Sequence, residues 1–414
     1  MASTEDLPEP HPLFELLSGE ISDRELRRCL RVVRLHLGMD VAFLSRFRET
    51  DRVLDHVDGP PDGPIHEGQI LPFADGYCMG VVRGELPQLI PDTSLVPAAQ
   101  CIPATWQIPI GAHMSVPIQV NGRIYGTLCC FSFLPRHDLG ERDIGMLRAF
   151  AEIFALRLHE VEAHKLERQA MIDEIDGALA AGAPRIVFQP VFALQGLRLH
   201  GFECLSRFDV VPQRGPAQWF QQAELAGVGI RLELHVLAKA LAYLRRFPPQ
   251  YRLSVNMSPE LIMSGSLAGL LGDDTEVTRL ILEITEHAIV RNYQALALAQ
   301  ALAPLRERGA QVAVDDAGAG YASMRHILQL QPDVIKLDMS ITQCIHSDRS
   351  RRALAKGLTN FAHEIGTRVV AEGVETAQEL DALRELQVDL VQGYFLSRPL
   401  SEDAALALAL SDAG

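Results

Sequence analysis

The spacing of hydrophobic residues changes partway along the 414-residue chain, and this change predicts two domains. In the first part, apolar residues follow helical spacing over 13–37 and the pattern of strands over 41–47 and 114–120. Asn121-Gly122 is a strong signal for a two-residue hairpin turn, so a returning strand is expected over 123–133. The Gly- and Pro-rich segment 59–68 is expected to be a loop. These features predict an α+β domain with an antiparallel sheet.

Residues 138–180 have a long helical pattern. Apolar residues recur at three- and four-residue steps from Ile144 to Val161, and charged residues then become frequent. One interpretation is a helix that closes the first domain and continues as a solvated connector. The other is a helix that pairs with its copy in a second subunit and transmits a signal between domains. The apolar repeat is too irregular to predict a coiled coil, so both interpretations stay open.

From Arg185 onward, short apolar runs alternate with helical stretches, as in parallel βα units. Eight such runs are expected to be strands: 186–191, 202–205, 253–255, 280–284, 312–314, 334–337, 368–371 and 390–392. Helices are expected between most of them, for example over 294–308 and 351–365. This alternation predicts an α/β TIM-like (β/α)8 barrel. An open doubly wound sheet is the alternative, but the sequence has no glycine-rich dinucleotide fingerprint.

Composition narrows the classes of function. The formal net charge of −15 argues against gripping polymeric nucleic acid through its phosphates. A small phosphorylated ligand remains compatible with this charge if metal ions supply the positive charge. No apolar run approaches the roughly 20 residues that span a bilayer, and the first residues lack the pattern of a secretory signal. The seven cysteines have no zinc or disulfide spacing, so we expect a cytoplasmic protein without a membrane span.

Polar residues stand at or near the ends of seven of the predicted barrel strands. In a βα barrel these ends meet at the C-terminal face, where reactive residues lie. The residues are Glu203, Asn256, Glu283, Glu286, Asp315, Asp316, Lys336, Glu372, Glu375 and Gln392. A single acid there could cap a helix or pair with an arginine. So many carboxylates at one rim repel one another and are costly to bury, and bound cations are the usual means of neutralising them.

The potential ligands at these strand ends all offer oxygen. They are Glu203, Asn256, Glu283, Asp315, Asp316 and Glu372. Oxygen ligands favour magnesium, manganese or calcium over zinc. Two such ions roughly 4 Å apart can activate water and stabilise an in-line displacement at phosphorus. Lys336, the one cation of the set, either steadies the acids through salt bridges or orients the attacking water and stabilises charge on the phosphate, and these roles are compatible.

A series of motifs in this half of the chain resembles one known family. They are Phe188-Gln189-Pro190, Glu203-Cys204-Leu205-Ser206-Arg207, Ser254-Val255-Asn256-Met257-Ser258-Pro259, Leu282-Glu283-Ile284-Thr285-Glu286, Asp315-Asp316-Ala317-Gly318-Ala319-Gly320-Tyr321, Ile335-Lys336-Leu337-Asp338, Ala371-Glu372-Gly373-Val374-Glu375-Thr376 and Gln392-Gly393-Tyr394-Phe395. In content and order they resemble the EAL-domain cyclic di-GMP phosphodiesterases, over about 175–408. That family is similar to a TIM barrel with one strand reversed.

The resemblance implies hydrolysis of cyclic di-GMP to linear 5′-pGpG with two Mg²⁺ or Mn²⁺ ions. It assigns metal binding to the six oxygen ligands named above. Catalytic roles fall on Glu203, Gln392, Lys336 and Glu286, of which Glu286 anchors a loop after the fifth strand that helps order the second metal and the dimer. Substrate contacts fall on Gln189, Leu205 and Arg207.

Three residues depart from the family pattern. Cys204 replaces the alanine of the name motif, and little loss is expected because this position is not a ligand. A buried, inert cysteine is expected there rather than an oxidisable one. Ala317 stands where phenylalanine is usual and Ala322 where serine is usual. These two changes affect the ordering of the loop, and therefore the level of activity, but they remove no ligand.

The N-terminal part resembles a GAF domain. The resemblance rests on Met114-Ser115-Val116-Pro117-Ile118 and on Gly122-Arg123-Ile124-Tyr125-Gly126-Thr127-Leu128. It implies a six-stranded antiparallel sheet, a small ligand of unknown identity, and dimerisation. A redox or metal role for Cys78, Cys101, His113, Cys129 and Cys130 is the alternative to ordinary core or surface positions. We expect a GAF-like domain over 10–160, a connector over 161–180 and an EAL-type barrel over 181–410, forming a homodimer.

Three functions are compatible with these features. The first is an active cyclic di-GMP phosphodiesterase regulated by the N-terminal domain. The second is a weak or inactive barrel that binds cyclic di-GMP as a sensor or effector, although such proteins usually lose metal ligands and this chain keeps them. The third is a metal-dependent hydrolase of another phosphodiester.

Overall fold

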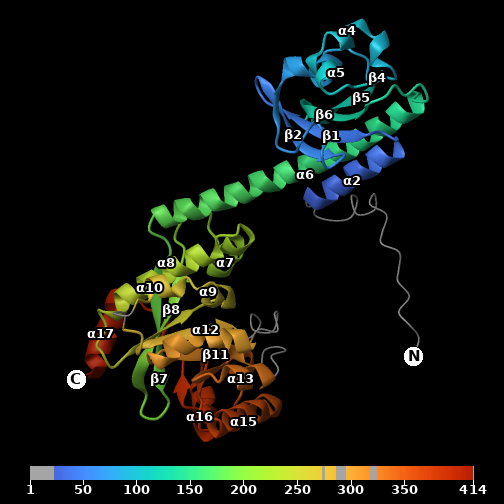
Figure 1. The fold of residues 1–414 in the computed structure, drawn as a ribbon. Coiled ribbons are helices and arrows are strands. Elements are labelled where there is room, and N and C mark those ends of the chain that lie inside the picture. Colours follow the sequence, from blue (N-terminus) through green and yellow to red (C-terminus); the bar gives the residue numbers. More distant parts are fainter. Residues whose placement is uncertain (1–22, 273–275, 286–294, 318–323, 414) are drawn as a thin grey trace, which may run out of the picture. The chain divides into compact units, whose positions relative to one another are not determined.

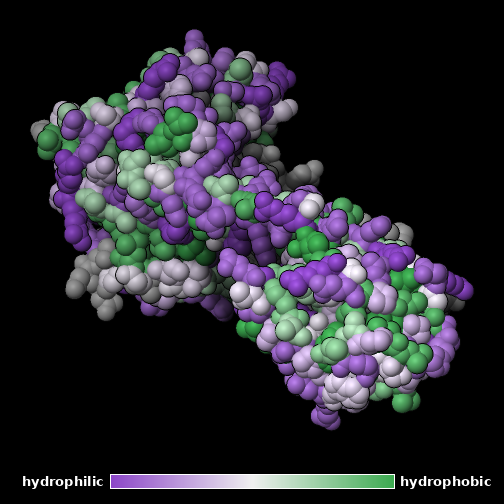
Figure 2. Space-filling model, turned by 90° about the horizontal axis from the view of Figure 1, so that it is seen from above, coloured by the Kyte–Doolittle hydropathy of each residue, from purple (hydrophilic) through white to green (hydrophobic). Residues whose placement is uncertain are grey.

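The computed structural model describes residues 23–272, 276–285, 295–317 and 324–413. The chain forms two compact units, divided between Glu167 and Arg168, which are described separately (Figure 1). Hydrophilic and hydrophobic residues are interspersed on the face seen in Figure 2. Within the described ranges, no helix is both long enough and apolar enough to cross a bilayer.

The first unit is built on a six-stranded antiparallel sheet with the strand order β3-β2-β1-β6-β5-β4. Its strands are β1 (Val41–Phe47), β2 (Asp51–Asp58), β3 (Ile70–Pro72), β4 (Leu89–Ile90), β5 (Ala112–Val120) and β6 (Arg123–Ser132). Its helices are α2 (Asp23–His36), α3 (Tyr77–Val82), α4 (Pro97–Gln100), α5 (Pro103–Gln107) and the start of α6 (Glu141–Ala180). The predicted α+β domain with its six-stranded sheet is confirmed.

Both faces of this sheet are buried, each in its own core. Because alternate residues of a strand point to opposite faces, a single strand contributes side chains to both cores. On β6, Leu128 and Cys130 pack in the core shared with α2 and α6, whereas Cys129 and Phe131 pack in the core shared with α3. In Figure 1, α2 and α6 lie along one face of the sheet and the short helices lie on the other. The second core surrounds a pocket that is considered below.

The predicted hairpin is confirmed between β5 and β6. Asn121 has a φ of 53° and Gly122 a φ of 73°, as a type I′ turn requires at both central positions. Strand β2 was not predicted, because charged residues interrupt its apolar pattern, although Val53 and Leu54 are buried. The predicted helix over 13–37 is described from Asp23 to His36, and its first part lies outside the described residues.

Helix α6 confirms the long helical pattern of the sequence as one helix of 40 residues. Near its start, Ile144 and Phe154 pack in the core of the first unit. Near its end, Ile175 packs in a cluster with Trp219 of the second unit. Residues 162–170 between these two ends are exposed. The boundary between the two units therefore lies within a continuous helix.

The second unit is a closed eight-stranded barrel with the order β10-β11-β12-β13-β14-β7-β8-β9. The strands are β7 (Arg185–Ala193), β8 (Arg198–Arg207), β9 (Arg252–Asn256), β10 (Leu280–Thr285), β11 (Gln311–Ala317), β12 (Val334–Leu337), β13 (Arg368–Ala371) and β14 (Leu390–Val391). Strand β7 is antiparallel to both of its neighbours, and the other neighbouring pairs are parallel. The predicted TIM-like barrel with one reversed strand is confirmed, and the alternative of an open doubly wound sheet is wrong.

Helices surround this barrel and bury its outer face. They are α7 (Pro216–Leu225), α8 (Gly229–Leu244), α9 (Pro259–Met263), α10 (Leu267–Leu270), α12 (Ala295–Glu307), α13 (Met324–Leu330), α14 (Met339–Thr342), α15 (Arg349–Glu364), α16 (Ala377–Glu385) and α17 (Glu402–Ala413). The largest core cluster joins β7–β11 to α8, α9, α12 and α17. A separate cluster joins β12, β13 and β14 to α15 and α16.

Candidate active site

The inside of the barrel changes from apolar to polar within two residues on five strands. Ile281, Ala313, Val334, Val370 and Leu390 belong to a small apolar cluster. Two residues further along the same strands, or immediately after them, come Glu283, Asp315, Lys336, Glu372 and Gln392. Because residues i and i+2 of a strand face the same side, the polar set continues the inward face toward the carboxyl ends of these strands. The fold thereby places these charges above an apolar floor.

Lys336 lies at the centre of this polar set. Its Nζ atom is 2.7 Å from a carboxylate oxygen of Glu372, 3.0 Å from Glu283, 3.1 Å from Asp315 and 3.6 Å from Glu203. The Lys336 side chain is only 3% exposed. Lys336 therefore forms salt bridges with the acids, which is one of the two roles predicted for it.

Glu203 reaches the same centre from β8. Asn256 at the end of β9 donates a hydrogen bond to its Oε1 atom at 3.2 Å, and Gln392 donates one to its Oε2 atom at 2.6 Å. These bonds join strands that are distant in sequence. They leave the amide oxygen of Gln392 buried without a hydrogen-bond partner.

The site carries a surplus of negative charge. Four carboxylates surround one ammonium, so full ionisation leaves three uncompensated negative charges. Burial and the neighbouring acids raise the pKa of Glu372 to about 8 and raise that of Glu283 well above its usual range, despite the opposing effect of Lys336. Burial opposes ionisation of Glu203, but Lys336 together with the hydrogen bonds from Gln392 and Asn256 lowers its pKa. The four acids raise the pKa of Lys336 despite its burial.

These features fit the binding of divalent cations. The donor set consists of carboxylate and amide oxygens, which suit hard ions, and additional positive charge would relieve the repulsion between the acids. In the present arrangement, no three Asp, Glu, His or Cys side chains of the described residues converge closely enough to hold a metal ion. The ammonium of Lys336 lies between the acids instead. Bound ions would compete with this ammonium for the same carboxylate oxygens.

The predicted substrate-contact residues lie close to this centre in the strand register. Gln189 on β7 is paired with Glu203 across the antiparallel ladder. Leu205 and Arg207 follow Glu203 at steps of two and therefore share its face of β8. Arg207 donates a hydrogen bond to the backbone oxygen of Ser206.

Two predicted residues are not placed by the structure. Asp316 belongs to β11, but its side chain lies outside the described part, and Glu286 lies wholly outside it, as does Ala322. Cys204 is 3% exposed, and burial together with Glu203 and Glu283 raises its pKa, as expected of an inert core thiol.

Sequence reasoning missed Glu379, which stabilises the backbone next to the site. This buried carboxylate accepts hydrogen bonds from the backbone N–H groups of Cys344, Glu375 and Thr376. It thereby fixes the loop that follows Glu372 to the segment after β12. The spacing Thr376-x-x-Glu379 is a capping-box signal that could have identified it.

Gly393 allows this loop to approach the end of β14. A Cβ atom at position 393 would lie 2.2 Å from the backbone nitrogen of Val374, so only glycine fits. The Val374 N–H donates a hydrogen bond to the Gln392 carbonyl at 3.1 Å. Close backbone contact thus holds Glu372 and Gln392 near each other.

The fold and site together define a TIM-like barrel with a buried acidic centre at its strand ends. Comparison with protein families agrees, since the EAL domain model matches residues 172–399 and the GAF domain model matches residues 23–158. The chain belongs to the EAL domain family and carries a GAF domain before the barrel.

Curated relatives match more than half of the chain. The chain is 33% identical over 242 residues to the cyclic di-GMP phosphodiesterase NbdA of Pseudomonas aeruginosa, covering 56% of this chain and 30% of NbdA. It is 29% identical over 262 residues to the oxygen sensor protein DosP of Escherichia coli, covering 60% and 32%. The chain thus spans about a third of the length of these two relatives.

Solved structures support the same family. The MucR phosphodiesterase in complex with c-di-GMP is 26% identical with a TM-score of 0.52, covering 57% of this chain and 100% of that one. An EAL domain protein from Listeria monocytogenes is 26% identical with a TM-score of 0.51, covering 55% and 93%.

Proposed function

We propose that the barrel hydrolyses cyclic di-GMP to linear 5′-pGpG with two divalent ions, Mg²⁺ or Mn²⁺, and that the GAF domain regulates this activity. The observation that carries the proposal is the convergence of Glu203, Glu283, Asp315 and Glu372 around Lys336. The names of NbdA and MucR, both phosphodiesterases, support the choice of reaction.

In this proposal the oxygen ligands named from the sequence hold the ions: Glu203, Asn256, Glu283, Asp315, Asp316 and Glu372. When bound, two ions supply the positive charge that lowers the pKa of a water molecule and stabilises the phosphorane-like transition state. The apolar floor below the site limits the access of bulk water from that side.

Lys336 contributes a fixed positive charge. The surrounding acids keep it protonated, so its ammonium could donate hydrogen bonds to water or to a phosphate oxygen. Gln392 holds Glu203 through its amide nitrogen and has a free amide oxygen that can accept a hydrogen bond from water. Gln189, Leu205 and Arg207 are assigned to contacts with the dinucleotide, and Glu286 to the loop after β11.

The test is turnover of cyclic di-GMP by the purified chain with Mg²⁺ or Mn²⁺, with the product separated by chromatography. Glu203→Ala and Lys336→Ala are each expected to reduce turnover at least about 100-fold, since each removes a group acting on the transition state. Glu364→Ala and Lys356→Ala are matched controls, because both side chains are exposed on α15.

Retained turnover in Glu203→Ala or Lys336→Ala, with both controls active, would contradict these assignments. Binding of cyclic di-GMP without turnover, in either metal, would instead establish the alternative of a sensor or effector barrel. Faster hydrolysis of another phosphodiester in direct competition would identify a different substrate.

A further inference from the structure

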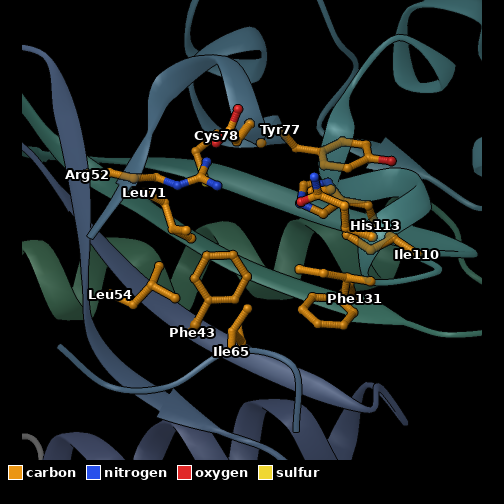
Figure 3. A pocket seen from close by; sticks show the side chains of 15 residues that line it. Phe43, Arg52, Leu54, Ile65, Leu71, Tyr77, Cys78, Ile110, His113 and Phe131 are labelled. Atoms are coloured by element: carbon orange, nitrogen blue, oxygen red, sulfur yellow. The ribbon is translucent and has the colours of Figure 1, made fainter. Parts of the chain in front are cut away.

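The GAF domain contains a pocket between its sheet and its short helices. The space between the surrounding atoms amounts to about 550 Å³, part of it open to solvent. Figure 3 shows aromatic and aliphatic side chains from several strands and loops around it. Its apolar lining includes Phe43, Leu54, Ile65, Ile110 and Phe131. An apolar body of modest size is therefore complementary to most of its wall.

The pocket lining also contains one buried, positively charged side chain, that of Arg52. Arg52 of β2 is only 4% exposed, and its Nε and Nη1 atoms are buried without hydrogen-bond partners. No carboxylate of the described residues forms an ion pair with it, although Asp75 also lines the pocket. An arginine stays charged in proteins, so it cannot escape this cost by losing a proton. An anion bound in the pocket would remove the cost.

The backbone is adapted to the position of this guanidinium. A Cβ atom at position 76 would lie 1.9 Å from Nη2 of Arg52 and 2.3 Å from Nη1. Gly76 therefore gives the guanidinium room beside the start of α3. Figure 3 shows the Arg52 side chain extending from its strand toward Cys78 and the centre of the pocket.

His113 provides a second polar group in the same pocket. Its ring stacks on Tyr77 with centroids 4.2 Å apart, and its Nδ1 atom is buried without a partner. Burial and the charge of Arg52 lower the pKa of His113 to about 3, so the ring is neutral at physiological pH. It can accept or donate one hydrogen bond without adding charge.

Cys78 is the remaining group of the lining that could balance Arg52. Cys129 and the charge of Arg52 lower the pKa of Cys78 to about 5 against the effect of burial. Its sulfur makes its contacts with Cys129, at 3.5 Å, and with Ser45, at 3.8 Å, rather than with the guanidinium. The donor atoms of Arg52 therefore remain available to a ligand.

We propose that this pocket binds a small organic anion, with a carboxylate or phosphate on Arg52, a hydrogen bond to His113, and an apolar ring-bearing body among the phenylalanine and aliphatic side chains. This inference concerns binding in the GAF domain and does not depend on the reaction of the barrel. Free carboxylic acids and phosphate esters share the chemistry that Arg52 recognises.

The test measures the binding of three probes with the same phenyl body to the full chain by calorimetry and thermal shift. Benzoate or phenyl phosphate is expected to bind at least ten-fold more tightly than neutral benzamide, and the tighter of the two identifies the anionic group. Arg52→Met is expected to reduce anion binding at least ten-fold. Arg123→Gln, which changes an exposed arginine of the same domain, is expected to leave it unchanged.

The melting temperature of unliganded Arg52→Met separates a binding role from a structural one. A binding residue held without a partner is expected to give an equal or higher melting temperature when removed, whereas a structural arginine would give a lower one. Cys78→Ser is expected to retain benzoate binding.

Four results would each overturn the proposal. The first is equal binding of benzamide and the anions. The second is no binding of any probe at 10 mM, roughly the weakest affinity expected of ligands of this size. The third is unchanged anion binding in Arg52→Met. The fourth is loss of binding in Cys78→Ser alone, which would assign the site to sulfur.

Discussion

At the scale of single residues, the barrel keeps buried polar groups in defined protonation states through their partners. His200 near the start of β8 shows this outside the acidic centre. Arg368 Nη1 lies 3.1 Å from His200 Nε2, and because arginine only donates, that nitrogen must accept. Burial and the charges of Arg368 and Arg252 lower the pKa of His200 to about 4. The folded protein therefore holds a neutral His200 where the unfolded chain holds a protonated one below about pH 6.5.

This difference predicts a pH dependence of stability. As the pH falls from 7 to 4, His200 binds a proton in the unfolded state but stays largely neutral in the folded state. This difference lowers the free energy of unfolding by about 1–3 kcal/mol. The contribution is fully present above the unfolded pKa and is lost on acidification. His200→Gln keeps an acceptor but does not titrate, so its stability should fall less over this range.

The measurement is urea unfolding at several pH values, followed by fluorescence in a Trp106→Phe background. Trp219, which is fully buried on α7, then reports on the barrel alone. Identical pH profiles with and without His200→Gln would show that His200 does not titrate as inferred.

At the scale of elements, helix α6 has exposed apolar side chains in its middle section. Leu156 is 54% exposed and Leu166 is 73% exposed, whereas both ends of the helix are packed in cores. A helix gains most of its stability from packing an apolar face. A second copy of the same helix would supply such packing, which is the arrangement predicted for a homodimer.

We expect the full chain to be a dimer in light scattering coupled to gel filtration. Leu166→Lys should weaken the dimer at least about ten-fold by placing a charge in the apolar contact. His164→Lys is the matched control, since residue 164 lies on the opposite face of the helix. A monomeric parent chain, or equal effects of the two substitutions, would rule out pairing through this face.

At the scale of the whole molecule, two units with their own cores are joined through one continuous helix. Arg168 donates a hydrogen bond to the backbone of Ala226, and Ile175 packs beside Trp219. The last part of α6 is therefore part of the barrel unit. A change in the GAF domain that alters the pairing or rotation of this helix has a direct covalent path to the barrel.

Regulation predicts that removing the GAF domain changes catalysis. A fragment of residues 168–414 keeps the α6 contacts of the barrel and should fold, as checked by the burial of Trp219 in fluorescence. Its turnover of cyclic di-GMP is expected to differ at least about three-fold from that of the full chain, and to be insensitive to benzoate or phenyl phosphate. If the fragment and the full chain have equal turnover, both with and without these probes, the GAF domain has only a tethering role.

The barrel and most of its site could be predicted because their signals are local. Buried parallel strands are short apolar runs, and the inward polar residue at each strand end interrupts such a run visibly, as at Glu283, Asp315 and Glu372. Strand β2 escaped prediction because its pattern mixes charged and apolar residues on a sheet that is buried on both faces.

The sequence by itself determined which residues stand at the strand ends. The alternation of apolar and polar residues, and the identity of the residues that carry oxygen ligands, follow directly from the order of residues in the chain. Only the tertiary structure decided that Lys336 lies among four carboxylates, and that Arg52 and His113 line one pocket with buried nitrogen atoms that lack hydrogen-bond partners. The physical reason is that desolvation and Coulomb interactions depend on distances between residues far apart in the chain. The periodicity of apolar residues along the chain does not reveal those distances.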